Sequence, residues 1–136
     1  MKTIISLILI VLMFAGCATM PTPEQVAKAD YGDYPADYQS AIKQHLSSRL
    51  YDPYTAQYSG WSRPFPVYYK PFMSSQILYG YRVCVAVNAK NRMGGYTGDK
   101  LHFFLIKNDA VIAHEGGNYR PNTYGEQNVH NLCRQD

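Results

Sequence analysis

The stretch Ile77-Leu-Tyr-Gly-Tyr-Arg-Val-Cys-Val-Ala-Val-Asn-Ala89 carries the strongest signal for secondary structure in this chain. Its side chains alternate, so an extended backbone would place Tyr79 and three valines on one face and Gly80, Arg82 and Cys84 on the other. Alternation with a period of two, in a segment rich in valine and tyrosine, predicts a β-strand. We expect this strand to be central in a sheet.

A β-hairpin is predicted after this strand. Residues 101–107 and 110–114 have the composition of strands, and Asn108-Asp109 between them tolerate the positive φ that a two-residue turn requires. The hairpin is apolar on both faces, and one helix covers only one side of a small sheet. The other face must be covered by the C-terminal tail, by the proline-rich segment 63–72 or by a partner protein.

The register of this hairpin decides whether two histidines can meet. A regular ladder from the two-residue turn pairs Phe103 with His114 and His102 with Glu115. His102 and His114 would then lie on opposite faces of the sheet, since neighbouring side chains alternate. We therefore predict a His102–Glu115 cross-strand pair and no metal site.

The remaining segments complete an α+β prediction. From Pro35 to about residue 50, apolar residues recur with helical spacing, and Asp52-Pro53 should end that helix. Residues 54–61 alternate like a strand, and a short helix is compatible with residues 125–132. We expect one N-terminal amphipathic helix packed on a small antiparallel β-meander of about four strands.

The loop at residues 88–99, Asn-Ala-Lys-Asn-Arg-Met-Gly-Gly-Tyr-Thr-Gly-Asp, is the most motif-like part of the chain. Its glycines indicate unusual backbone angles, but no Gly-Lys-Ser/Thr follows, so a Walker-type nucleotide site is not indicated. A structural hairpin loop and a contact site for an anionic or glycan group or a protein remain as alternatives. The candidate partner-binding residues are Lys90, Arg92, Gly94, Gly95, Tyr96 and Gly98.

The combination of Asn88-Ala89-Lys90-Asn91 with Gly94-Gly95-Tyr96, preceded by Asp52-Pro53-Tyr54 and Val83-Cys84, resembles a group of small exported bacterial proteins. The resemblance covers about residues 38–107. That group has no established activity, so the resemblance implies export and no particular function.

The N-terminus has the pattern of a leader. Lys2 precedes an apolar run over residues 4–14, which is about 11 residues or roughly 16 Å of helix. A membrane-spanning helix needs about 20 residues, whereas a signal-peptide core has this length. The run ends at Phe14-Ala15-Gly16-Cys17.

Residues 1–17 resemble a bacterial lipoprotein signal at Ala15, Gly16 and Cys17 and depart from it at Phe14, where Leu is usual. The resemblance implies cleavage before Cys17 and its lipidation by a diacylglyceryl group and an N-acyl chain such as palmitate. Several acyl chains hold a protein firmly on a membrane. Ala18 follows the cysteine, which in that family implies the outer membrane of a Gram-negative cell, and we expect the domain to face the periplasm. The alternative is an ordinary secreted protein cut elsewhere.

The two other cysteines follow from that location. In an oxidising compartment, Cys84 and Cys133 are most simply a disulfide, with a buried free Cys84 as the alternative. The chain then divides into a signal peptide (1–16), a lipidated cysteine with a flexible tether (17–34) and one α+β domain (35–136).

Composition excludes some functions and leaves others open. The chain has 13 Lys and Arg against 10 Asp and Glu, which is too balanced for a nucleic-acid-binding surface. No nucleophile elbow occurs, and both candidate thiols are expected to be oxidised. We expect no cofactor, no catalysis, and a binding or structural role in the cell envelope. The alternatives are an inhibitor of a cell-wall-degrading enzyme and an envelope enzyme.

Overall fold

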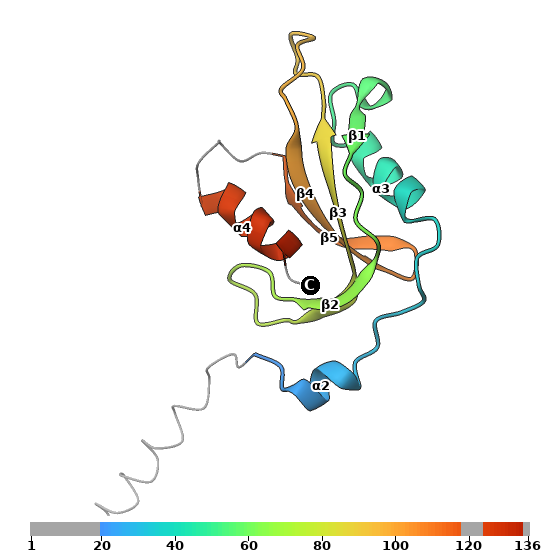
Figure 1. Cartoon of the computed structure of the whole chain (residues 1–136), viewed down its shortest axis with the longest axis vertical. Coiled ribbons are helices and arrows are strands. Elements are labelled where there is room, and N and C mark those ends of the chain that lie inside the picture. Colours follow the sequence, from blue (N-terminus) through green and yellow to red (C-terminus); the bar gives the residue numbers. More distant parts are fainter. Residues whose placement is uncertain (1–19, 118–123, 135–136) are drawn as a thin grey trace, which may run out of the picture.

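The computed structural model describes residues 20–117 and 124–134, so the predicted leader and Cys17 lie outside the described residues (Figure 1). The described chain mixes helices with one antiparallel sheet, which confirms the α+β class. Its elements are α2 (Pro23–Ala27), α3 (Tyr38–Ser47), the 3₁₀ helix η2 (Pro53–Thr55), β1 (Gln57–Ser59), β2 (Phe65–Tyr69), β3 (Leu78–Asn88), β4 (Lys100–Lys107), β5 (Ala110–Gly116) and α4 (Tyr124–Arg134).

The sheet has five strands rather than the predicted four or so, because one of its edges is built from two short strands. The strand order is β1-β3-β4-β5, and β2 also pairs with β3. β1 lies along residues 86–88 of β3, and β2 lies along residues 78–82. Between them the Ser62 amide donates to the Cys84 carbonyl at 2.8 Å. Gly60, with a φ of 64°, marks the break.

The turn between β4 and β5 is the predicted two-residue turn, but the hairpin that follows it contains a bulge. Asn108 and Asp109 have φ values of 50° and 60°, and Lys107 faces Ala110, as expected. The register then shifts at Ile112, which has no opposite residue, so the ladder from there on is displaced by one position. A bulge places two residues of one strand opposite one residue of its partner.

This shift overturns the predicted histidine placement. Phe104 faces His114 and Phe103 faces Glu115, so the expected His102–Glu115 pair does not form. A one-residue slip moves every later side chain of the strand to the other face. His102 and His114 consequently lie on the same face of the sheet, which is the face covered by α3.

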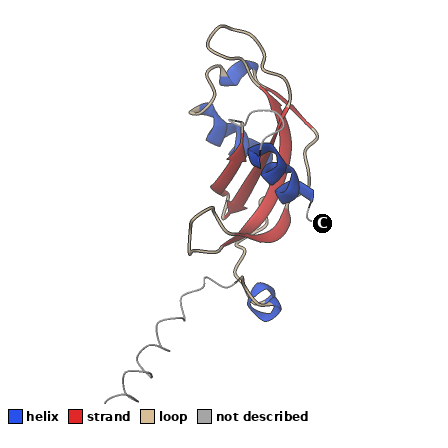
Figure 2. Cartoon of the chain, turned by 90° about the vertical axis from the view of Figure 1, so that its left-hand side faces the viewer, coloured by secondary structure: helices blue, strands red, loops and turns tan. Residues whose placement is uncertain are grey.

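The two faces of the sheet carry separate apolar cores, each closed by one helix (Figures 1 and 2). Under α3 the buried residues are Ile42, Leu46, Val83, Val85, Val87, Phe104 and Ile106. Under α4 they are Tyr69, Cys84, Phe103, Leu105 and Val129. The C-terminal helix therefore covers the second apolar face of the hairpin, which answers the question that the sequence left open.

The segment expected to be a flexible tether is partly folded onto the domain. The Tyr31 ring lies 5.8 Å from the Tyr79 ring, and the Lys107 ammonium lies 3.1 Å from the Asp30 carboxylate. A Cβ on Gly32 would lie 2.5 Å from the Asn108 side chain, which shows how closely this segment contacts the β4–β5 turn. From Asp30 onward, the segment belongs to the folded domain.

Candidate functional site

The predicted partner-binding loop between β3 and β4 is a compact turn held by its own hydrogen bonds. Lys90 and Tyr96 form an isolated antiparallel bridge. The Asn91 amide donates to the Gly95 carbonyl at 2.8 Å, and the Gly94 amide donates to the Asn91 carbonyl at 3.0 Å. Gly94 has a φ of 80°, which favours glycine at that position. The loop therefore presents its side chains from a fixed backbone.

Several amides of this loop are already bonded within it. The Asn91 Oδ1 atom accepts from the amides of Met93 at 2.9 Å and Gly95 at 3.1 Å. The Asn88 Oδ1 atom accepts from the Gly98 amide at 3.0 Å. A phosphate cradle needs backbone amides that point at the ligand. The geometry therefore disfavours an anion cradle and leaves the loop's side chains as its contact groups.

The loop contacts η2, and the two segments together expose a group of large side chains. The Tyr96 hydroxyl donates to the Thr55 carbonyl at 3.1 Å, and the Lys90 ammonium lies 5.4 Å from the Tyr96 ring centre. Tyr54 is 99% exposed and Met93 is 94% exposed. We call this end of the molecule the tip surface; its residues are Tyr51, Tyr54, Lys90, Arg92, Met93 and Tyr96.

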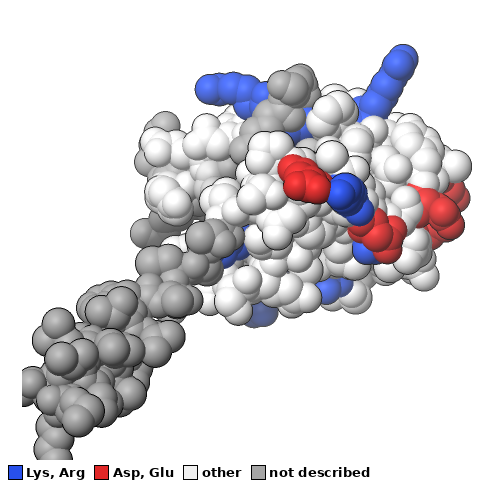
Figure 3. All heavy atoms as spheres, turned by 90° about the horizontal axis from the view of Figure 1, so that it is seen from below, with Lys and Arg blue, Asp and Glu red and all other residues white. Residues whose placement is uncertain are grey.

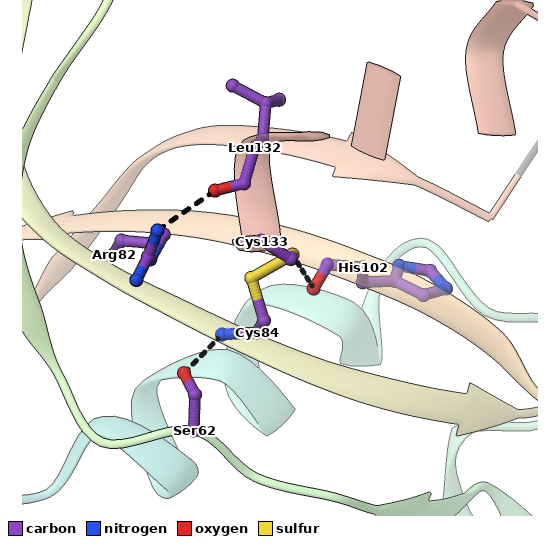
Figure 4. The surroundings of a disulfide bond; sticks show 6 residues. All are labelled: Ser62, Arg82, Cys84, His102, Leu132 and Cys133. Carbon is purple, nitrogen blue, oxygen red and sulfur yellow. Dashed lines mark hydrogen bonds between the residues drawn. A yellow bond between two sulfur atoms is a disulfide. The ribbon is translucent and has the colours of Figure 1, made fainter. Parts of the chain in front are cut away.

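The predicted disulfide is present and fastens the end of α4 to β3 (Figure 4). The sulfur atoms of Cys84 and Cys133 are bonded, with the two Cα atoms 5.9 Å apart. Beside them, the buried Arg82 donates from Nη1 to the Leu132 carbonyl at 3.1 Å. A cation near a helix C-terminus is favourable, because the last carbonyls carry negative partial charge. This arrangement is structural and holds α4 over its apolar core.

A chain of three histidines is the feature that sequence reasoning missed. His102 Nδ1 lies 2.9 Å from His114 Nε2, and His114 Nδ1 lies 3.3 Å from His45 Nε2 on α3. The His114 ring stacks on Phe104, with ring centres 4.4 Å apart and planes 14° from parallel. Both ring nitrogens of His114 are therefore engaged by other histidines at a packed, aromatic position.

The surroundings of the chain keep its rings neutral. Burial, with a smaller contribution from Lys100, lowers the pKa of His102 to about 4. Burial, followed by the two neighbouring histidines and Arg49, lowers the pKa of His114 to about 3. Burial and Arg49 also lower the pKa of His45. Desolvation disfavours the imidazolium, which explains the common direction.

Neutral rings restrict what the chain can do chemically. A neutral imidazole has one N–H donor and one acceptor nitrogen. The two hydrogen bonds must therefore run in one sense, either from His102 toward His45 or in reverse. Among the described residues, no three His, Cys, Asp or Glu side chains are placed to hold a metal ion.

The sequence held only weak signals for this chain. His45 borders the apolar stripe of α3, a position typical of a partly solvated side chain, and it is half-buried. Gly116 and Gly117 adopt φ values of 126° and 81°, and a Cβ on either would lie within 3 Å of His102. The glycine pair was visible in the sequence, but its contact with His102 was not.

Comparisons with known proteins place no family on this chain: no family model, no curated protein and no solved structure matches it. Within residues 20–117 and 124–134, no helix is long and apolar enough to cross a membrane.

Proposed function

We propose that the protein is a lipoprotein of the outer membrane, held by acyl chains on Cys17 and facing the periplasm, whose domain binds an envelope partner without catalysis. The lipobox-like Phe14-Ala15-Gly16-Cys17 supports the anchor. The Cys84–Cys133 disulfide supports an oxidising compartment, where such bonds persist.

The tip surface is the observation that carries the binding role. Aromatic residues, methionine and arginine are enriched at protein interfaces, and all three types occur here. Tyr51, Tyr54 and Met93 are each at least two-thirds exposed, although burial of large apolar side chains is favourable. Met93 extends from a loop whose backbone is already hydrogen-bonded, and Tyr54 lies in η2, to which that loop is bonded through Tyr96, so binding would order little additional chain.

One observation favours the inhibitor of a cell-wall-degrading enzyme as a specific form of this role. The β3–β4 loop extends beyond the rest of the sheet, at the top of Figure 1. A narrow, ordered loop with Arg92 at its end has a shape that enters an enzyme cleft. That form predicts that the domain slows wall lysis in a turbidity assay and that Arg92→Ala restores lysis.

The anchor is tested by changing the lipidated atom. A Cys17→Ser chain should lose its acyl mass and leave the membrane fraction, because serine has no thiol to form the thioether bond to the lipid. Fractionation and intact mass measure both properties. Retention of the variant in the envelope, with unchanged processing, would remove the basis for the anchor.

The binding role is tested by photo-crosslinking in native membranes. A photoreactive residue at Met93 should capture one discrete partner. The same residue at Ile112, which is exposed on β5, serves as the matched control and should not capture it. Tyr54→Ala should weaken capture by about tenfold or more, as interface anchors do, and leave the melting temperature unchanged. Equal capture from both positions would argue against the tip surface.

A further inference from the structure

The turn between β2 and β3 exposes two large apolar side chains at its corners. Phe72 is 86% exposed and Met73 is 92% exposed. The Ser74 amide donates to the Pro71 carbonyl at 3.1 Å, so the four residues 71–74 form a closed β-turn. Corner positions of exposed turns usually carry Gly, Asn, Asp or Ser. Two apolar residues here therefore need an explanation outside the fold of the turn.

The backbone of the turn strengthens this point. Met73 has a φ of 59°, a conformation that is uncommon for residues other than glycine. The Gln76 amide donates to the Ser74 hydroxyl oxygen at 3.0 Å, which fixes the exit from the turn. The apolar pair is thus held outward by an ordered backbone, at some conformational cost.

The turn lies at the end of the domain where the described chain starts. Tyr31 contacts Tyr79, one residue beyond the first residue of β3, and its hydroxyl donates to the Val26 carbonyl of α2 at 2.8 Å. Figure 1 shows α2, the β2–β3 turn and the start of the described chain at this same end. The tip surface lies at the other end of β3, whose 11 residues span roughly 35 Å.

The position of the proposed anchor limits how far this end can be from lipid. Cys17 precedes the first described residue, Met20, by three residues, which span at most about 10 Å when fully extended. Met20 itself is 59% exposed. An acylated Cys17 would hold this end of the domain beside the headgroups and raise the local concentration of the turn at the membrane.

The charge pattern of the turn fits contact with a lipid surface. Residues 71–81 contain no charged side chain, so their approach to lipid desolvates no ion. The face seen from below in Figure 3 is mostly free of charged residues, with one group of acidic and basic side chains on it. Tyr68 pairs with Tyr79 across β2 and β3 beside the turn. Tyrosines are enriched at the boundary between lipid and water.

We propose that Phe72 and Met73 insert into the lipid surface beside the acylated Cys17 and so form a second membrane contact. This inference rests on the proposed lipid anchor and extends it. One attachment point leaves the domain free to tumble, whereas two fix its orientation. With the turn in the headgroup region, the tip surface points away from the membrane, toward a partner in the periplasm.

The test uses the acylated chain in phospholipid vesicles that contain dibrominated phosphatidylcholine. Met73→Trp places a fluorophore in the turn, and Met93→Trp, at an equally exposed methionine of the tip surface, is the matched control. Trp61 is common to both. We expect a blue shift and roughly twofold quenching for Met73→Trp, because brominated chains quench fluorophores at the depth that a short apolar contact reaches. Little change is expected for Met93→Trp.

The outcomes separate this inference from the anchor. Intact mass of the same sample reports acylation of Cys17. Acylated chain without selective quenching at position 73 would overturn the second contact and leave the anchor standing. Chain that carries no acyl group would overturn both. Photo-crosslinking from Phe72 to an envelope protein instead of lipid would also overturn the lipid contact.

Discussion

Acidification from pH 7.5 to pH 5 should destabilise this protein through the histidine chain. His102 and His114 titrate at an ordinary pKa near 6.5 in the unfolded chain but at a pKa of about 4 and about 3 in the folded protein. Between these values the unfolded state binds more protons than the folded state. The two histidines therefore leave the unfolding free energy undiminished above pH 6.5, and the unfolding free energy falls as the pH decreases below 6.5.

The size of this effect follows from the linkage relation. Each histidine that stays neutral in the fold contributes up to about 1.4 kcal/mol per pH unit below its unfolded pKa. Over the 1.5 units from pH 6.5 to 5, His102 alone contributes about 2 kcal/mol. His114 is partly exposed, so solvent reduces its contribution to the loss of stability. The two histidines together then contribute about 3 kcal/mol. A domain of this size is stable by roughly 5–15 kcal/mol.

Urea unfolding at a series of pH values measures this loss, with His130→Gln on the exposed side of α4 as the matched control. The His102→Gln variant should have a shallower dependence on pH, whatever its stability at pH 7.5, whereas His130→Gln should keep the parent slope. An unfolding free energy that stays level to pH 5 would refute the reasoning. A free energy that rises on acidification would show instead that a proton shared along the chain stabilises the fold.

Three further outcomes test the packing. Replacement of Cys84 and Cys133 by Ala should lower the unfolding free energy by about 4 kcal/mol, since the bond closes a loop with a sequence separation of 49; equal stability with and without reductant in the parent would contradict this. Gly80→Ala should cost about 1–3 kcal/mol, because a Cβ there would lie 2.7 Å from the Ile106 carbonyl oxygen. Gly95→Ala, whose Cβ makes only ordinary contacts at 3.7 Å, should be close to neutral, and thermal melting compares the two.

Much of the fold could be predicted because its signals are local. Alternation identified β3, and two residues tolerant of positive φ identified the β4–β5 turn. The pairing of Cys84 with Cys133 followed from the expectation that Cys17 is lipidated, which leaves two thiols in an oxidising compartment. Helical spacing placed a helix where α3 lies, at Tyr38–Ser47. Each of these features is decided by neighbouring residues or by simple counting.

The histidine chain could not be predicted because it depends on contacts between distant segments. The bulge at Ile112 reverses the face of His114, and nothing in the local sequence distinguishes it from a regular ladder. His45 then reaches His114 from a helix that is 69 residues earlier in the chain. Such an arrangement is set by the packing of α3 on the sheet, which a pattern of apolar residues does not describe.

Both edges of the sheet are irregular, and this has a consequence for self-association. One edge is divided between β1 and β2 and contains Pro66, which has no backbone donor. The other edge strand, β5, carries the bulge at Ile112. Long, regular edge strands act as templates for domain swapping and aggregation between copies. The interruptions on both sides of this sheet therefore disfavour pairing between copies.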